Sequence, residues 1–192
     1  MGSRHYSATL TLALAACATP QATTLDDFEA TLAAQDSATV ALTRWCDAHG
    51  IADPAEVRAS PVVGERVAVP PSLRKTLQVS ADAPLGYRHV RLSCGGTVLS
   101  EAHNWYVPGR LTPEMNHTLE NTDTPFGRVA GPLGFTRERL ASLRGAAPGC
   151  PEATILSHRA ILRLPDGRPI SALVECYTAE NLAISRPARP AR

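Results

Sequence analysis

Two segments of alternating apolar and polar residues, each with a turn near its centre, constrain the fold of this chain most strongly. In residues 87–107, apolar side chains recur at every second position up to Gly95 and Gly96, and an extended segment follows. Residues 154–177 are interrupted at 165–168 by the turn sequence Pro-Asp-Gly-Arg. Each segment predicts a β-hairpin, so the chain contains at least part of an antiparallel sheet.

Helical patterns surround these hairpins. We expect helices over residues 25–34, 37–49 and 112–121, each preceded or opened by a good capping residue. Residues 136–143 also have the composition of a short helix, whereas Pro-Phe-Gly at 125–127 predicts a turn. Helices combined with antiparallel hairpins indicate an α+β fold with an antiparallel sheet.

The start of the chain has the layout of a bacterial secretory signal. Arg4 precedes an apolar stretch over residues 8–16, and the run Leu-Ala-Ala-Cys at 14–17 resembles the site where lipoproteins are cut and acylated at the cysteine. The stretch is about half of the ~20 residues that a membrane-spanning helix needs. We therefore expect lipidation of Cys17 and an extracytoplasmic protein attached to the membrane through its N-terminal lipid. The alternative is an apolar cytosolic start with a chance cysteine.

Length and charge narrow the possible classes further. About 175 residues follow Cys17, which fits one domain with a single core. The formal net charge is +1, from 19 basic and 18 acidic residues without a basic stripe, which argues against a nucleic-acid partner. We expect a signal peptide over residues 1–17, a tether over 18–24, a folded domain over 25–180 and a disordered tail over 181–192.

Four cysteines remain once Cys17 is assigned to lipid. An even number in an oxidising compartment allows two disulfides in any of three connectivities. Buried free thiols are the alternative, because two of the four lie in strand-like patterns where cysteine is a small hydrophobic residue. The four are Cys46, Cys94, Cys150 and Cys176.

Two charged residues stand in apolar strand patterns. Arg88 is predicted on the same strand face as the apolar residues of the first hairpin, where it needs a carboxylate or a ligand. Glu175 lies within an apolar segment of the second hairpin, where burial raises a carboxyl pKa and suits it to donate a proton. A site for a small anionic ligand would need such a pair. Alternatively, Arg88 and Glu175 form a structural ion pair with each other.

Several short motifs, in a shared order over residues 25–178, resemble those of chorismate lyases. Thr-Pro-Phe-Gly-Arg at 124–128 and Phe-Thr-Arg at 135–137 are similar to the TPLGR and LTR segments of that family, and Asp-Ser-Ala-Thr at 36–39 is similar to its DSxT segment. The first hairpin, which ends in Val-Pro, matches a strand–turn–strand unit of the family. Gly-Arg-Pro at 167–169 resembles its GKP turn, which leads with a one-residue gap to a glutamate.

The resemblance implies a chorismate-lyase-like (UTRA-like) fold, in which an antiparallel sheet of about six strands is flanked by helices that enclose an internal ligand cavity. The family releases pyruvate from chorismate to leave 4-hydroxybenzoate, without metal or cofactor. The family's site residues fall on Arg88, which would bind the ring carboxylate, and on Glu175, which would bind the ring hydroxyl and transfer protons. Phe126 replaces a leucine and Ala38 replaces a methionine that line the family's pocket.

The export signal departs from this family, because chorismate is made in the cytosol. Two hypotheses follow: a lyase that acts on chorismate or an analogue, and a non-catalytic periplasmic lipoprotein that binds or senses a small aromatic or cyclic carboxylate. A related group of regulators uses the same fold for sensing. Glu114 and His117 lie one helical turn apart without a third ligand at suitable spacing, so we expect no metal and no cofactor. We also expect a monomer.

Overall fold

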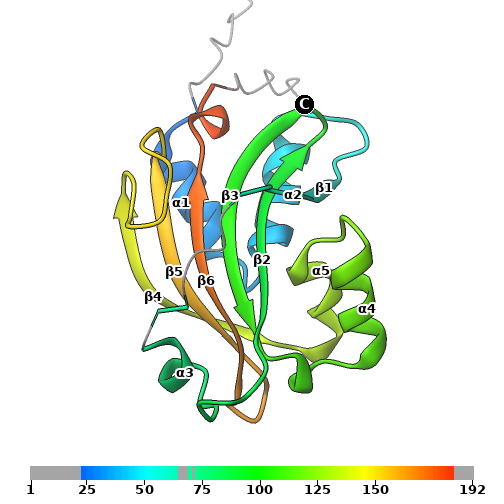
Figure 1. The fold of residues 1–192 in the computed structure, drawn as a ribbon. Coiled ribbons are helices and arrows are strands. Elements are labelled where there is room, and N and C mark those ends of the chain that lie inside the picture. Colours follow the sequence, from blue (N-terminus) through cyan, green and yellow to red (C-terminus); the bar gives the residue numbers. More distant parts are fainter. Residues whose placement is uncertain (1–22, 65–68, 71, 184–192) are drawn as a thin grey trace, which may run out of the picture.

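The computed structural model describes residues 23–64, 69–70 and 72–183, and within them a six-stranded antiparallel sheet forms the centre of the molecule (Figure 1). The strand order is β1-β2-β3-β6-β5-β4. The α+β fold class and the antiparallel sheet are confirmed. The strands are β1 Val57–Pro61, β2 Gly86–Cys94, β3 Thr97–Tyr106, β4 Thr136–Arg144, β5 Leu156–Arg163 and β6 Pro169–Tyr177.

The two predicted hairpins, β2–β3 and β5–β6, join through the pairing of β3 with β6. Arg88 on β2 lies opposite Asn104 on β3, and Ala102 on β3 lies opposite Glu175 on β6. Directly opposed residues of antiparallel strands point to the same face of the sheet. The topology therefore brings Arg88 and Glu175 to one face, two strands apart.

The helices begin largely where the sequence predicts. The Thr24 side chain accepts from the backbone N–H of Asp27 in a reciprocal capping box, and Ser37 caps the second helix through Val40. None of the described helices is long and apolar enough to cross a bilayer. The helices are α1 Leu25–Ala33, α2 Ala38–Ala48, α3 Leu73–Thr76, α4 Pro113–Asn121 and α5 Phe126–Val129, with 3-10 turns at Pro108–Arg110, Gly131–Leu133 and Ala179–Asn181.

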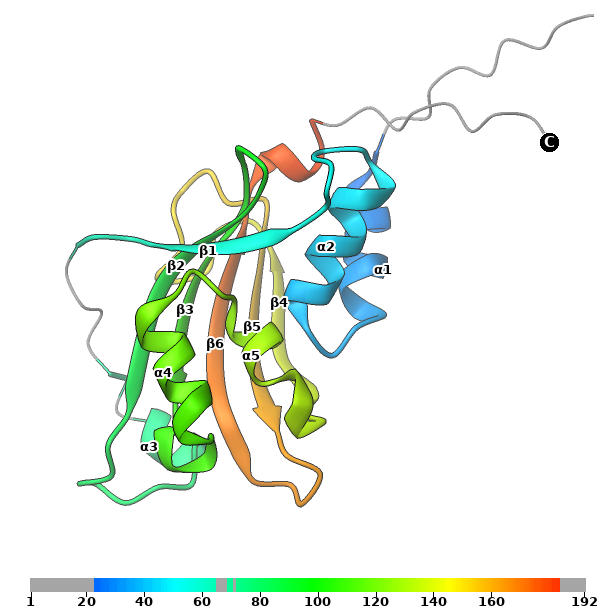
Figure 2. The same cartoon turned by 90° about the vertical axis from the view of Figure 1, so that its right-hand side faces the viewer.

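The main core lies between the first two helices and the sheet. Figure 2, which views the sheet from its side, shows α1 and α2 packed together against it. Phe28 of α1 makes edge contacts with Trp45 of α2 and Tyr177 of β6, at ring-centroid distances of 4.9 and 5.3 Å. On the opposite face, α3 covers a smaller cluster around Trp105. The face under α1 and α2 is the face that carries Arg88 and Glu175.

Two disulfides connect the four cysteines of the described chain. Cys46–Cys94 ties α2 to the end of β2, and Cys150–Cys176 ties the β4–β5 loop to β6. The free-thiol alternative is therefore wrong, and the connectivity that the sequence leaves open is settled. Bonds that close loops of this length restrict the unfolded chain and stabilise the fold.

The helix expected over residues 136–143 is wrong, because this segment forms β4. Its leucine, alanine, arginine and glutamate residues favour a helix by only tenths of a kcal/mol each. Pairing with β5 from Thr136 to Arg144, with a bulge between Arg139 and Ala141, instead satisfies most of the backbone groups that face β5. The many charged side chains of β4 suit an edge strand. The turn expected at 125–127 is also inaccurate, since Pro125 is the N-cap of α5.

The folded chain also extends past residue 180, where the disordered tail was expected to begin. Asn181 is fully buried, and its side-chain Nδ2 donates to the Leu99 carbonyl at 2.7 Å. The indole Nε1 of Trp45 donates to the Asn181 carbonyl at 3.2 Å. Cys17 and most of the expected tether lie outside the described residues.

Candidate ligand-binding site

A cavity lies between the sheet, the start of α2 and the short helix α5. Water-sized molecules have about 40 Å³ for their centres within it, and about 490 Å³ of space lies among its lining atoms when the part that opens to solvent is included. All four residues that the sequence singles out as substrate-binding line it: Ala38, Arg88, Phe126 and Glu175. The other lining residues are Asp36, Ser37, Thr39, Val90, Leu92, Ala102, Asn104, Gly127, Phe135, Arg137, Leu162 and Leu173.

Arg88 enters the cavity without a carboxylate partner among the residues that the structure describes. Its Nη1 donates to the Thr124 carbonyl at 3.0 Å, and its Nη2 donates to the Thr122 carbonyl at 3.4 Å. Burial lowers the pKa of the guanidinium, which the nearby Tyr106 only partly offsets. The two carbonyls position the cation but do not neutralise it. The alternative of a direct ion pair between Arg88 and Glu175 is therefore wrong.

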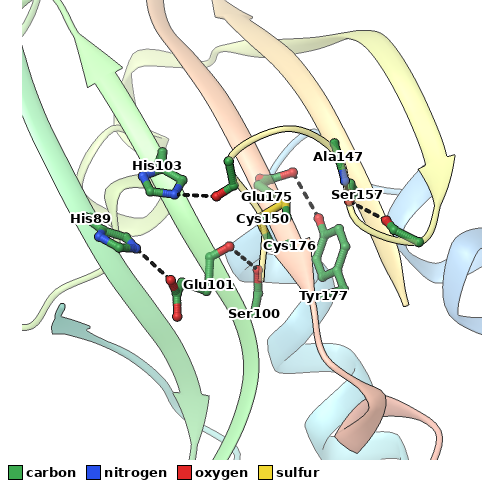
Figure 3. Close-up of a disulfide and its surroundings, with 12 residues drawn as sticks. His89, Ser100, Glu101, His103, Ala147, Cys150, Ser157, Glu175, Cys176 and Tyr177 are labelled. Atoms are coloured by element: carbon green, nitrogen blue, oxygen red, sulfur yellow. Dashed lines mark hydrogen bonds and ion pairs between the residues drawn. A yellow bond between two sulfur atoms is a disulfide. The ribbon is translucent and has the colours of Figure 1, made fainter. Parts of the chain in front are cut away.

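Glu175 is instead held by Arg137 of β4. Arg137 Nη1 donates to Glu175 Oε1 at 3.0 Å, and Nη2 donates to Oε2 in a second, short contact. The Tyr177 hydroxyl also donates to Glu175 Oε2 at 3.0 Å, as Figure 3 shows. The side chains of Arg137 and Glu175 are 5% and 4% exposed. The carboxylate is thus fully enclosed and accepts three charge-assisted hydrogen bonds.

The raised pKa expected for Glu175 is wrong. Burial acts to raise the pKa of this carboxyl, but the charge and hydrogen bonds of Arg137, followed by His158 and Tyr177, bring it below its ordinary value. In the same pair, Glu175 raises the pKa of Arg137 against the effect of burial. A carboxylate in this setting remains ionised and is a poor proton donor.

His158 lies beside this ion pair on β5, opposite Glu175 in the strand pairing. Its imidazole is 1% exposed and contacts the Tyr177 ring edge-on at a centroid distance of 5.3 Å. Burial lowers the pKa of His158 to about 4, despite the attraction of Glu175. The imidazole is therefore neutral at pH 7, and the charge of Glu175 is balanced by Arg137.

Arg137 and Asn104 are the site residues that the sequence reasoning does not identify. Arg137 stands in the Phe-Thr-Arg motif, but the expected helix over 136–143 hides its strand position. Asn104 lies opposite Arg88 in the β2–β3 pairing, and its face could have been read from the hairpin register. Asn104 is 3% exposed, and its Oδ1 accepts a short hydrogen bond from the Ser171 hydroxyl.

The roof of the cavity depends on a close approach between α2 and α5. A Cβ atom added to Gly127 would lie 2.3 Å from Ser37 Oγ and 2.9 Å from Thr39 Oγ1. The absence of a side chain at Gly127 lets α5 rest on the start of α2. Ala38 and Phe126 line the cavity from these two helices, so both side chains shape its roof.

A second group of titratable side chains lies on the other face of the sheet. His89 Nε2 and Glu101 Oε1 are 2.8 Å apart, and the rings of His89 and His103 stack at 4.1 Å (Figure 3). In the described chain, potential ligand atoms of these three residues lie within 4.8 Å of one another. Both His103 nitrogens already have partners, the Tyr87 hydroxyl and the Gly149 carbonyl. His89, Glu101 and His103 therefore belong to a hydrogen-bond network in which each side chain has a partner within the protein.

The cavity therefore combines apolar walls with charges of two kinds. At one end, Arg137 and Glu175 neutralise each other. At the other end, Arg88 presents a cation that no carboxylate of the described chain pairs with. Asp36 lies at the exposed rim, where its Oδ1 accepts the backbone N–H of Arg137 at 2.9 Å. An anionic group placed at the Arg88 end would neutralise this cation.

Comparisons with known proteins support the fold and identify one relative. No protein-family model matches the chain. PhnF from Mycobacterium smegmatis superposes with a TM-score of 0.53 and 14% identity over 82% of this chain and 70% of that one. The effector domain of PhnF, a structure of its own, gives 0.52 and 13% over 76% of this chain and 90% of that domain.

These neighbours have the chorismate-lyase-like fold of regulator effector domains, so the expected fold family is confirmed. A possible transcriptional regulator, YydK from Bacillus subtilis, matches with a TM-score of 0.45 and 15% identity; the match covers 69% of this chain and 62% of that one. The protein named "Uncharacterized protein y4mC" of Sinorhizobium fredii is 41% identical over 182 residues, which cover 85% of this chain and 77% of that protein. On this identity and coverage, the chain belongs to the same family as y4mC.

Proposed function

We propose that the domain binds a small aromatic or cyclic monocarboxylate and does not convert it. The observation that carries this proposal is the half-buried guanidinium of Arg88, which faces a cavity with largely apolar walls and has no carboxylate partner among the described residues. A half-buried cation without a counterion has lost part of its hydration, and an anionic ligand would offset that loss. Among the described residues that line the cavity, Arg88 is the cation without a carboxylate partner, which favours an anionic ligand.

The surroundings of Arg88 also suit an anionic ring. The Phe126 side chain and the apolar residues of β2 and β6 provide a surface for stacking and packing. Helix α2 directs its N-terminal end toward the cavity, where Ala38 and Thr39 are among the lining residues, and the positive end of a helix favours a nearby anion.

The state of Glu175 favours binding over lyase chemistry. Pyruvate elimination assigned to this residue would need a carboxyl group that exchanges protons with the substrate. The Glu175 carboxylate is engaged by Arg137 and Tyr177 on both oxygens, and its pKa is lowered. Both the binding hypothesis and the lyase hypothesis place the carboxylate of the ligand on Arg88. They differ in whether the protein converts the ligand to a product.

One experiment tests binding and catalysis together. The full chain is titrated with 4-hydroxybenzoate in a calorimeter and incubated separately with chorismate, with 4-hydroxybenzoate formation followed by absorbance. We expect saturable binding of 4-hydroxybenzoate, no binding of the neutral 4-hydroxybenzamide, and no turnover. Turnover that disappears in Arg88→Met would replace this proposal with the lyase. Absence of binding to either compound would reject both.

We further propose that the chain is a lipoprotein, acylated at Cys17 and facing the periplasm. The Leu-Ala-Ala-Cys run at 14–17 supports the lipidation, and the two disulfides of the domain support an oxidising compartment. Metabolic labelling with a radioactive fatty acid tests it. Label should enter the wild-type chain and be lost in Cys17→Ser, whereas equal labelling of both would contradict the proposal.

A further inference from the structure

Within the described chain, the cavity holds one buried hydrogen-bond donor that no protein group accepts. This donor is the side-chain Nδ2 of Asn104, a residue that is 3% exposed and lines the cavity. Buried amide donors are almost always paired, because an unpaired one costs about 1–3 kcal/mol. The other polar atom of the same side chain, Oδ1, is engaged by the Ser171 hydroxyl.

The position of this donor relates it to Arg88. Asn104 and Arg88 are directly opposed in the β2–β3 pairing, so their side chains leave the sheet on the same face. Arg88 is longer and reaches toward the carbonyls of Thr122 and Thr124. The short Asn104 amide stays on the floor of the cavity. A ligand group bound between them would meet a charged donor and a neutral donor.

We propose that Asn104 is a ligand-binding residue whose Nδ2 donates to the carboxylate that Arg88 binds, so that the two donors divide the two carboxylate oxygens. This inference rests on the proposed function and specifies the geometry of its anion subsite. It makes the ligand class an unsubstituted carboxylate, because an ester or amide would remove one of the two acceptor oxygens or the charge. Asn104 would then set specificity without contributing charge.

The test uses the full chain with benzoate and 4-hydroxybenzoate as probes. The double variant Asn104→Leu with Ser171→Ala removes the unpaired donor and also the hydroxyl that would lose its acceptor. We expect the affinity for both probes to fall by about ten-fold, and by a similar factor for each, since both carry the same carboxylate. Asn104→Asp, which places an acceptor at this position, should weaken binding further.

Matched variants separate this role from a structural one. Ser171→Ala alone keeps the donor and should leave both affinities within about two-fold of wild type. If the double variant binds both probes like wild type, Asn104 does not contact the ligand. If it loses 4-hydroxybenzoate but not benzoate, Asn104 contacts the ring hydroxyl and the assignment to the carboxylate is wrong. A failure of wild type itself to bind either probe would instead reject the proposed function.

Discussion

The two ends of the cavity treat buried charge in opposite ways. At the β4–β6 end, Arg137 and Glu175 form a doubly hydrogen-bonded ion pair, with Tyr177 as a third contact. At the β2–β3 end, the partners of Arg88 among residues 23–64, 69–70 and 72–183 are backbone carbonyls, and Asn104 has a donor that no group in these ranges accepts. We call these the paired end and the open end.

The difference separates residues that hold the fold from residues that are available to a ligand. Removal of one partner from a buried pair leaves an uncompensated charge, so the paired end should dominate stability. Donors without protein partners stabilise little in the absence of a ligand, so the open end should dominate binding. The four predictions below test this division, from the largest expected effect to the smallest.

Glu175→Gln should destabilise the fold by about 3–5 kcal/mol, because it leaves Arg137 charged and buried without its counterion. Urea denaturation at pH 7 measures the free energy of unfolding. The double variant Arg137→Met with Glu175→Leu removes both charges and should recover much of the loss. A loss below about 1 kcal/mol in the single variant would show that the paired end does not support the fold.

Arg88→Met should abolish most carboxylate binding, with a loss of about 2–5 kcal/mol in binding free energy, and should leave the free energy of unfolding nearly unchanged. Calorimetric titration with 4-hydroxybenzoate and urea denaturation give the two values. Arg128→Met is the control, since Arg128 is an exposed arginine paired with Glu56. Equal binding by both variants would remove Arg88 from the site.

The lowered pKa of His158, at the paired end, predicts that the free energy of unfolding falls in acid. Its pKa is about 4 in the folded chain and about 6.5 when unfolded, so between these values the unfolded state binds a proton that the folded state does not. The free energy of unfolding should therefore fall as the pH falls from 6.5 to 4, by about 1–3 kcal/mol from this group. His158→Leu should flatten that part of the profile. His117→Asn, which removes an exposed imidazole, is the control, and identical profiles for wild type and His158→Leu would refute the prediction.

Gly127→Ala should destabilise the roof by about 1 kcal/mol. The new methyl group collides with Ser37 and Thr39, at a cost of about 1–3 kcal/mol, but alanine regains about 1 kcal/mol through its better helix propensity. Thermal unfolding measures the result. Gly109→Ala, where an added Cβ meets no atom within 4 Å, is the matched control. If Gly127→Ala is as stable as Gly109→Ala, then α2 and α5 can move apart at little cost and the prediction is wrong.

The sequence predicts most of the fold because its signals are local. The Gly95-Gly96 turn, the Thr24 and Ser37 caps and the Pro-Asp-Gly-Arg turn act within a few residues, and each is found where expected. The strand β4 is missed because its residues favour a helix in isolation, and the pairing with β5 that overrides this preference is a long-range effect.

The sequence predicts only part of the site, because local patterns place some of its residues whereas long-range pairing decides their partners. Alternation and the family resemblance bring Ala38, Arg88, Phe126 and Glu175 to the cavity, where the structure places all four. Their partners could not be predicted. The choice of Glu175 between Arg88 and Arg137 depends on the position of β4, and the resulting pKa follows from that choice. The roles of these residues in binding stay predictions.

The seam between β3 and β6 gives ligand binding a consequence for stability. The open end lies on the first hairpin, and Glu175 of the paired end lies on the second, so a ring that fills the cavity touches both sides of this seam. A ligand bound as proposed would therefore contact both halves of the sheet at once. Because it would bind the folded state and not the unfolded one, it would raise the free energy of unfolding of both hairpins together.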